Sequence, residues 1–161
     1  MRKVIRKISA AIVATTIIVA MCATCFAGTT FEGYFGQREN WYEGADGSLS
    51  GATASSFSAD MDAIGWGGVW GAQAHRDITV KKGQKYTLSF KATTTTAEKW
   101  VFFKVTDSQD TVVYADWLHL QPGVTENYKA TFKASANATF IYYGMGGEFG
   151  DRTEEQGDIY A

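Results

Sequence analysis

The stretch Trp100-Val101-Phe102-Phe103-Lys104-Val105 decides how this chain of 161 residues is interpreted. Its β-branched and aromatic residues favour a strand. Successive side chains of a strand point to opposite faces of the sheet, so if Val101 and Phe103 face a core, Trp100 and Phe102 must face away from it. Bulky aromatic side chains on an outer face indicate a surface on which another molecule stacks.

A second stretch repeats this pattern near the end of the chain. In Phe140-Ile141-Tyr142-Tyr143, an inward Ile141 and Tyr143 would leave Phe140 and Tyr142 on the outer face. The sequence therefore predicts two strands with aromatic rings on both sides. One side belongs to a core and the other to a binding surface.

Residues 1–27 have the features of a secretory signal peptide. Four basic residues lie within the first seven positions, residues 8–21 form an apolar run, and Cys25-Phe26-Ala27 offers small residues at the positions that a signal peptidase reads. A membrane anchor is the alternative, although the run is short for a span of roughly 20 residues. A lipoprotein signal, with lipid on Cys22 or Cys25, is a further alternative.

Cleavage after Ala27 would change the composition of the chain. Both cysteines would be lost, as would four of the 15 Lys and Arg residues, whereas all 17 acidic residues would remain, which leaves a net charge of about −6. An acidic balance argues against nucleic acid and against an anionic membrane as partners. Residues 28–161 are numerous enough for one monomeric domain with a core of its own. We expect this domain to be secreted, with the bacterial cell surface as a further destination.

The rest of the sequence is typical of an all-β protein. Runs rich in Thr, Val, Tyr, Phe and Trp alternate with turn residues, and no segment keeps a helical period. The clearest turn is Lys81-Lys82-Gly83-Gln84. Regular spacing of short strands predicts a β-sandwich or jelly roll. The expected strands are 52–58, 68–80, 84–92, 99–107, 111–120, 125–134, 137–145 and 156–161.

Catalytic chemistry is hard to assemble from these residues. His75 and His119 are the only histidines, and each stands alone in its local sequence. The sequence contains no nucleophile motif of the Gly-x-Ser-x-Gly type and no glycine loop of the phosphate-binding kind. Glu148 belongs to an acidic loop that continues to Glu155, and such clusters are usually solvated. We therefore expect a non-catalytic domain.

Binding is better supported than catalysis. Trp70 lies in a glycine-rich stretch, residues 65–71, that would leave the ring accessible. An aromatic ring can stack on the C–H patches of a sugar, while nearby polar groups hydrogen-bond the hydroxyls. Packing of the tryptophans in the core is the alternative interpretation.

Three parts of the sequence resemble secreted carbohydrate-binding modules of the family 4, 9 and 22 group, the CenC-like domains. Residues 83–92, Gly-Gln-Lys-Tyr-Thr-Leu-Ser-Phe-Lys-Ala, are similar to a hairpin of these modules. Phe31-Glu32-Gly33 followed by Trp41 is similar to their opening segment. Residues 141–147 followed by Gly157-Asp158-Ile159-Tyr160 resemble their last two strands, with the final strand cut short.

The resemblance implies a jelly-roll β-sandwich whose concave sheet binds single β-glycan chains such as xylan, β-glucan or amorphous cellulose. It also implies a tethered glycoside hydrolase, such as an endo-xylanase, and one structural calcium ion, which by position would draw on Glu32 and Asp158. The residues expected to bind the polysaccharide are Trp70, Trp100, Phe102, Phe140 and Tyr142 by stacking, and Arg76 and Glu148 by anchoring hydroxyls. Gln73 and Lys104 are further polar candidates. A small glycan-degrading enzyme and a structural sandwich of a surface protein remain as alternatives.

Overall fold

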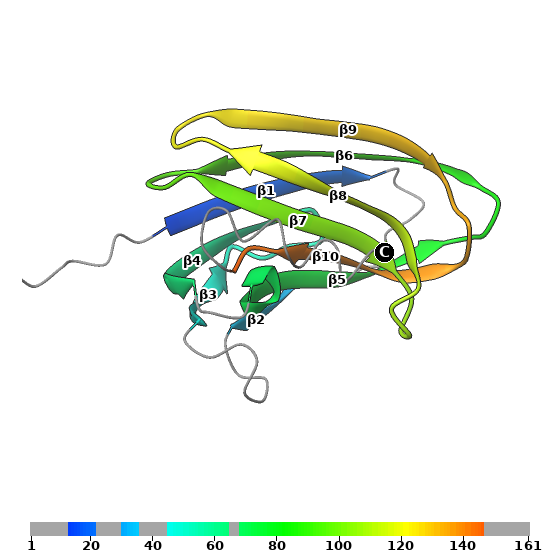
Figure 1. The fold of residues 1–161 in the computed structure, drawn as a ribbon, viewed down its shortest axis with the longest axis horizontal. Helices are drawn as coiled ribbons and strands as arrows, with labels where there is room; N and C mark the ends of the chain where they lie inside the picture. Colours follow the sequence, from blue (N-terminus) through cyan, green and yellow to red (C-terminus); the bar gives the residue numbers. More distant parts are fainter. Residues whose placement is uncertain (1–12, 22–29, 36–44, 65–67, 147–161) are drawn as a thin grey trace, which may run out of the picture.

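The protein is a sandwich of two five-stranded antiparallel sheets, in a computed structural model that describes residues 13–21, 30–35, 45–64 and 68–146 (Figure 1). In the first sheet, sheet A, the strands lie in the order β3 (Ala45–Ser50), β4 (Ser56–Ile64), β1 (Val13–Met21), β6 (Lys85–Thr94) and β9 (Thr125–Lys133). In the second, sheet B, the order is β2 (Glu32–Phe35), β5 (Ala72–Val80), β10 (Ala138–Gly144), β7 (Lys99–Thr106) and β8 (Val112–Leu120).

Most neighbours in these sheets are not consecutive in the sequence. Strand β6 pairs with β9, and β10 lies between β5 and β7. Such crossovers between two packed sheets are the pattern of a jelly roll, so the predicted fold class is confirmed. A 3₁₀ turn, η2 (Gly68–Gly71), precedes β5.

The core lies between the two sheets and contains the inward side chains expected from the alternation. Val101, Phe103, Ile141 and Tyr143 of sheet B are fully buried. Phe90 of sheet A contacts two of them across the interface, with ring centroids 5.0 Å from Phe103 and 5.4 Å from Tyr143. Each buried ring of this size contributes roughly 1.5–3 kcal/mol through removal of apolar surface from water.

Two turns are well defined, the expected one at Lys81–Gln84 and one between β7 and β8. At Lys81–Gln84 the Gln84 amide donates to the Lys81 carbonyl at 3.2 Å, and Gly83 has a φ of 82°, which glycine adopts without strain. At the turn between β7 and β8, Asp110 has a φ of 66°, a conformation that Asp and Asn tolerate better than most residues.

The strands differ from the expected ones in several places, and β2 lies outside every expected strand. The expected strand 52–58 is replaced by β3 and β4, and the expected strand 68–80 begins only at Ala72 because η2 occupies its first four residues. The expected strand 156–161 lies outside the described residues.

Strand β1 was not expected, because its residues belong to the predicted signal peptide. An apolar, β-branched run fits both a signal core and a buried strand, and periodicity alone does not separate them. In the structure Val13–Met21 is the central strand of sheet A. The signal peptide stays a prediction.

Candidate functional site

The outer face of sheet B, away from the core, carries a continuous group of aromatic side chains. Residues that pair directly across antiparallel strands lie on the same face. Trp100 of β7 pairs with His119 of β8, and Phe102 pairs with Trp117. Tyr142 of β10 follows on the other side of β7. We define the aromatic face as Trp70, Trp100, Phe102, Trp117, Phe140 and Tyr142.

Trp70 reaches this face from η2 and packs across the strands. Its ring lies edge to face with Phe102 at 5.3 Å and with Tyr142 at 6.4 Å between centroids. Gly144 makes this packing possible, because a Cβ at that position would come within 3.0 Å of the Val69 carbonyl oxygen and 3.2 Å of Trp70 Cε3. The position of the Trp70 ring therefore depends on the absence of a side chain at Gly144, 74 positions later in the chain.

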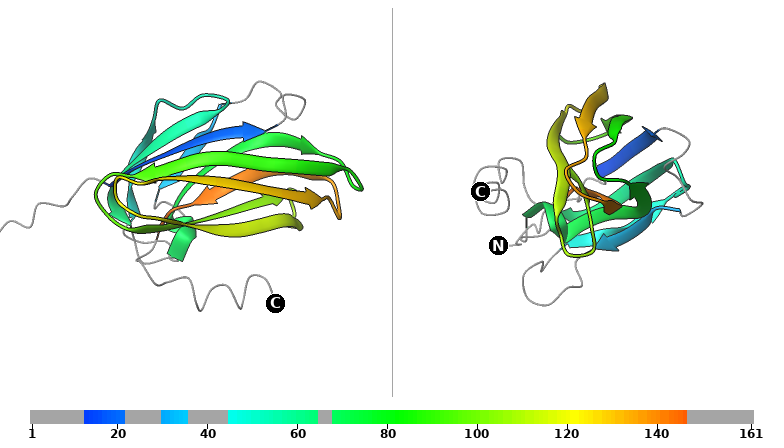
Figure 2. Two further views of the ribbon diagram at one scale, coloured as in Figure 1. Left: turned by 90° about the horizontal axis from the view of Figure 1, so that it is seen from above. Right: turned by 90° about the vertical axis from the view of Figure 1, so that its right-hand side faces the viewer.

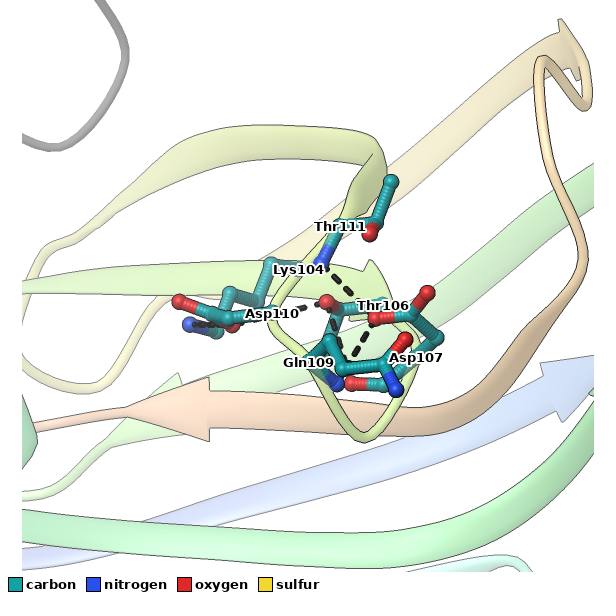
Figure 3. A network of polar contacts seen from close by, with 6 residues as sticks. All are labelled: Lys104, Thr106, Asp107, Gln109, Asp110 and Thr111. Carbon is teal, nitrogen blue, oxygen red and sulfur yellow. Dashed lines mark hydrogen bonds and ion pairs between the residues drawn. The ribbon is translucent and has the colours of Figure 1, made fainter.

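A polar network lies at the β7–β8 turn, as Figure 3 shows. The Lys104 ammonium donates to Asp110 Oδ1 at 2.6 Å and lies 4.5 Å from the Trp70 ring centroid and 5.7 Å from that of Tyr142. A cation over an aromatic face is attracted by the ring quadrupole. Lys104 therefore ties the turn to the aromatic face.

The carboxylate of Asp107 orders the same turn. It accepts hydrogen bonds from the backbone amides of Gln109 at 2.9 Å and Thr111 at 2.8 Å (Figure 3). These bonds stabilise the charged form, so they lower the pKa of Asp107 below its ordinary value, with the Thr111 amide as the largest cause.

The other end of β7 presents a mixed aromatic and polar cluster. Trp100 stacks on the imidazole of His119, with centroids 4.2 Å apart and planes within 10°. His119 Nε2 is hydrogen-bonded to Glu98 Oε1, and Gln121 Nε2 donates to the same oxygen at 2.8 Å. Amide and carboxylate groups thus flank the rings of the aromatic face at this end of the sheet.

Polar groups also flank the face on the side of β5. His75 stacks on Tyr142 at 5.3 Å, and its Nε2 lies 3.7 Å from Glu32 Oε2, an ion pair when the imidazole is protonated. Gln73, a polar candidate from the sequence, donates from Nε2 to the Trp70 carbonyl at 3.1 Å. This bond helps to fix the backbone that carries Trp70.

The structure brings together five of the residues predicted to bind: Trp70, Trp100, Phe102, Phe140 and Tyr142. Phe102 differs from the expectation in its exposure. Only 2% of it is accessible, because Trp70 packs against it from η2 and Trp117 packs against it at 4.9 Å from β8. Phe102 is thus the floor beneath the other rings, and its expected direct stacking on a ligand needs correction.

Arg76 is a clear correction. The alternation of β5 places it on the inner side with Ala74 and Ile78, and it is only 1% exposed. Its Cζ lies 5.5 Å from the ring centroid of Phe31, and burial lowers the pKa of the guanidinium. Arg76 therefore contributes to the core and cannot anchor a ligand on the outer face. Arginine in a strand is expected to point to solvent, and only the pairing of β5 with β2 and β10 sets its direction.

Two residues of the site were missed from the sequence. Trp117 and His119 lie on the same face as Trp100 because β8 pairs with β7 in that register. Their spacing of two residues placed them on one side of a strand, but the sequence alone did not say which strand lies next to them.

The remaining expectations concern metal and membrane. Glu148 and Asp158 lie outside the described residues. Among those that the structure does describe, no three His, Cys, Asp or Glu side chains converge as a metal site, so the calcium ion expected at Glu32 and Asp158 stays a prediction. The described part of the chain also has no helix long and apolar enough to span a membrane.

No protein-family model and no curated protein matches the sequence. Solved structures with a similar fold include one described as "BiXyn10A CBM1 APO", with 13% identity, a TM-score of 0.52, and coverage of 79% of this chain and 86% of that chain. Another, described as "CBM4 structure and function", has 16% identity and a TM-score of 0.50, and the match covers 73% of this chain and 86% of that one. At such low identity the likeness concerns the fold. The chain has the β-sandwich fold found in carbohydrate-binding modules.

Proposed function

We propose that this protein is a non-catalytic module that binds carbohydrate on the outer face of sheet B. The observation that carries the proposal is the aromatic face, in which Trp70, Trp100 and Tyr142 lie over a buried floor. The likeness of the fold to carbohydrate-binding modules supports the same function. A group of half-buried aromatic rings that share one face of a sheet offers apolar surface to a binding partner.

In this proposal the aromatic side chains stack on the sugar rings, and the polar side chains hydrogen-bond the hydroxyls. The half-buried rings of Trp100, Trp117 and Tyr142 offer edges and faces to the apolar C–H patches of a pyranose. Glu98 and Gln121 lie beside Trp100 and offer carboxylate and amide groups to the hydroxyls. Glu148, which lies outside the described residues, is proposed as a further hydrogen-bonding residue.

The proposed ligand is a β-linked plant cell-wall polysaccharide such as xylan, β-glucan or amorphous cellulose. The family resemblance of residues 83–92 supports this choice, as does the name of the similar BiXyn10A module. In this proposal the module is secreted, forms a concave cleft for a single glycan chain, and directs an attached glycoside hydrolase to its substrate. A structural calcium at Glu32 and Asp158 belongs to the same proposal.

Affinity electrophoresis in gels that contain xylan, β-glucan, mannan or starch tests the proposal. We expect retention in a β-glycan gel, with a Kd in the micromolar range or weaker, about −8 kcal/mol or less favourable. Trp100→Ala and Tyr142→Ala should each weaken binding by about 2 kcal/mol, roughly thirtyfold, as expected for central aromatic anchors.

Lys91→Ala, on an exposed position of β6 in sheet A, is the matched control and should bind as the parent does. The two aromatic variants must melt at the same temperature as the parent protein, so that their weaker binding reflects the missing ring and not unfolding. If both variants are retained like the control, the aromatic face is not the binding site. Release of reducing sugar by the isolated protein would instead favour an enzyme.

A further inference from the structure

Strand β1 fills a slot between β4 and β6, which do not pair with each other in the described residues. It is antiparallel to both, paired with β4 over Val13–Ile18 and with β6 over Thr15–Met21 (Figure 2, blue strand). Without β1, sheet A would separate into two strand pairs, β3–β4 and β6–β9. The backbone groups of β4 and β6 that face β1 would then lose their partners.

The slot also covers part of the core. The residues of β4 and β6 beside β1 include Phe57, Met61, Leu88 and Phe90, all 3% exposed or less. An empty slot would open this cluster to water, at roughly 25 cal/mol for each Å² of apolar surface. The sandwich therefore needs a strand at this position in every folded state.

Residues 13–21 nevertheless lie within residues 1–27, which the sequence predicts to be removed on export. We propose that the slot is a strand-acceptor site, and that after cleavage residues 156–161 of the same chain take the place of β1. The inference rests on the predicted signal peptide and is independent of the proposed carbohydrate binding.

The pattern of residues 156–161 fits the slot. In β1 the odd-numbered positions pair with core residues, since Ile17 lies opposite Phe57 and Ala92. A replacement strand therefore needs apolar or small residues at every second position. Gly157, Ile159 and Ala161 meet this need, and Asp158 and Tyr160 would then face solvent on sheet A. Glu32 lies on the outer face of sheet B, so this arrangement and the proposed calcium site at Glu32 and Asp158 exclude each other.

The segment is also within reach of the slot. The described chain ends at Gly146, next to η2, where the Gly146 amide donates to the Val69 carbonyl. Ten further residues to position 156 can extend over as much as ~33 Å, about the length of a small domain. A segment tethered in this way has an effective concentration in about the millimolar range, which favours it over a strand from a second molecule.

The test uses the full-length chain, exported by a bacterial host and purified from the exported fraction. Intact mass establishes whether residues 1–27 have been removed, and hydrogen exchange then follows the amides of β4 and β6. We expect a cleaved monomer in which these amides are protected. Ile159→Pro removes a backbone donor and an inward side chain, so both strands should lose most of their protection while β7 and β10 keep theirs. Thr153→Pro is the matched control and should keep all four strands protected.

A synthetic peptide with the sequence of residues 13–21 separates an open slot from a domain that has failed to fold. Added to the Ile159→Pro variant, it should restore protection of β4 and β6. Three results would overturn the proposal: a purified protein that retains residues 13–21, protection that Ile159→Pro leaves unchanged, or a dimer in which a second copy fills the slot. Failure of the peptide to restore protection would count against it as well.

Discussion

The ion pair between Lys104 and Asp110 predicts an asymmetry between two substitutions. The Lys104 side chain is only 10% exposed, whereas that of Asp110 is 61% exposed. Asp110→Asn would leave the ammonium largely buried against Trp70 without its countercharge. Lys104→Met would instead leave a carboxylate in water and keep an apolar stem of similar length in place. Removal of the exposed partner should therefore cost more than removal of the buried one.

The magnitudes follow from these environments. An asparagine at position 110 keeps an amide oxygen that can accept from the Lys104 ammonium, so the substitution removes the countercharge and not the acceptor. A charge-assisted hydrogen bond is roughly twice as strong as a neutral one, so the expected loss is about 1–2 kcal/mol. Lys104→Met removes the ion pair and the cation–π contact, which stabilise the fold. It also removes the cost of burying a charge, so the free energy of unfolding should change by less than about 1 kcal/mol. Asn is the matched replacement at position 110, because it tolerates the φ of 66° and preserves the turn.

Urea unfolding at pH 7, followed by circular dichroism, measures both changes. The double variant Lys104→Met/Asp110→Asn should be close to Lys104→Met alone, because no buried charge is left to be stranded. Equal losses in the two single variants, or losses that simply add in the double variant, would refute this reasoning. Sugar binding should weaken in Asp110→Asn as well, since the ammonium would move and release Trp70.

Two further predictions concern Gly144 and Tyr143. In Gly144→Ala the added Cβ would lie 3.0 Å from the Val69 carbonyl oxygen, so Trp70 should shift by a few tenths of an ångström. Its fluorescence and the affinity for glycan should both change. Unchanged fluorescence would contradict the packing described for η2. Tyr143 is fully buried, and loss of solvation raises its pKa above the ordinary value of 10.0, so the folded state keeps the proton where the unfolded state loses it. Stability should fall above about pH 10 by ~1.4 kcal/mol per pH unit for this group. Tyr143→Phe should reduce that slope, and it should cost little stability at pH 7 because the hydroxyl has no hydrogen-bond partner in the described structure. Urea unfolding at several pH values measures the slope, and an unchanged slope in the variant would contradict this assignment. Tyr128, whose pKa is also raised, first by burial and then by its bond to Asp116, should retain part of the slope in the variant.

Local alternation was enough to predict the two faces of β7 and β10. The inward positions of Val101, Phe103 and Ile141 follow from a period of two residues, and the structure confirms them. The outward positions of Trp100 and Tyr142 follow from the same period, since a strand that buries one face must turn the intervening side chains to the other.

Other features depend on pairing between distant segments, which a single sequence does not specify. The inward direction of Arg76 is set by the neighbours of β5, and the place of Trp117 by the register with β7. Trp70 is held by Gly144, far away in the chain. For β1 the difficulty is of another kind, because an apolar, β-branched run is compatible both with an export signal and with the central strand that it forms in sheet A.

The burial of β7 on both sides has a consequence for binding. All residues of this strand except Trp100 are buried, so Phe102 and Lys104 are covered on the outer face by the rings that pack against them. Rings held in this way lose little conformational freedom when a ligand arrives, and ordering of side chains is one of the main costs of association. A flexible aromatic surface would bind the same sugar more weakly for the same contact area. If the aromatic face binds carbohydrate as proposed, the packing of Trp70 and Trp117 over Phe102 would pre-organise the half-buried rings around them.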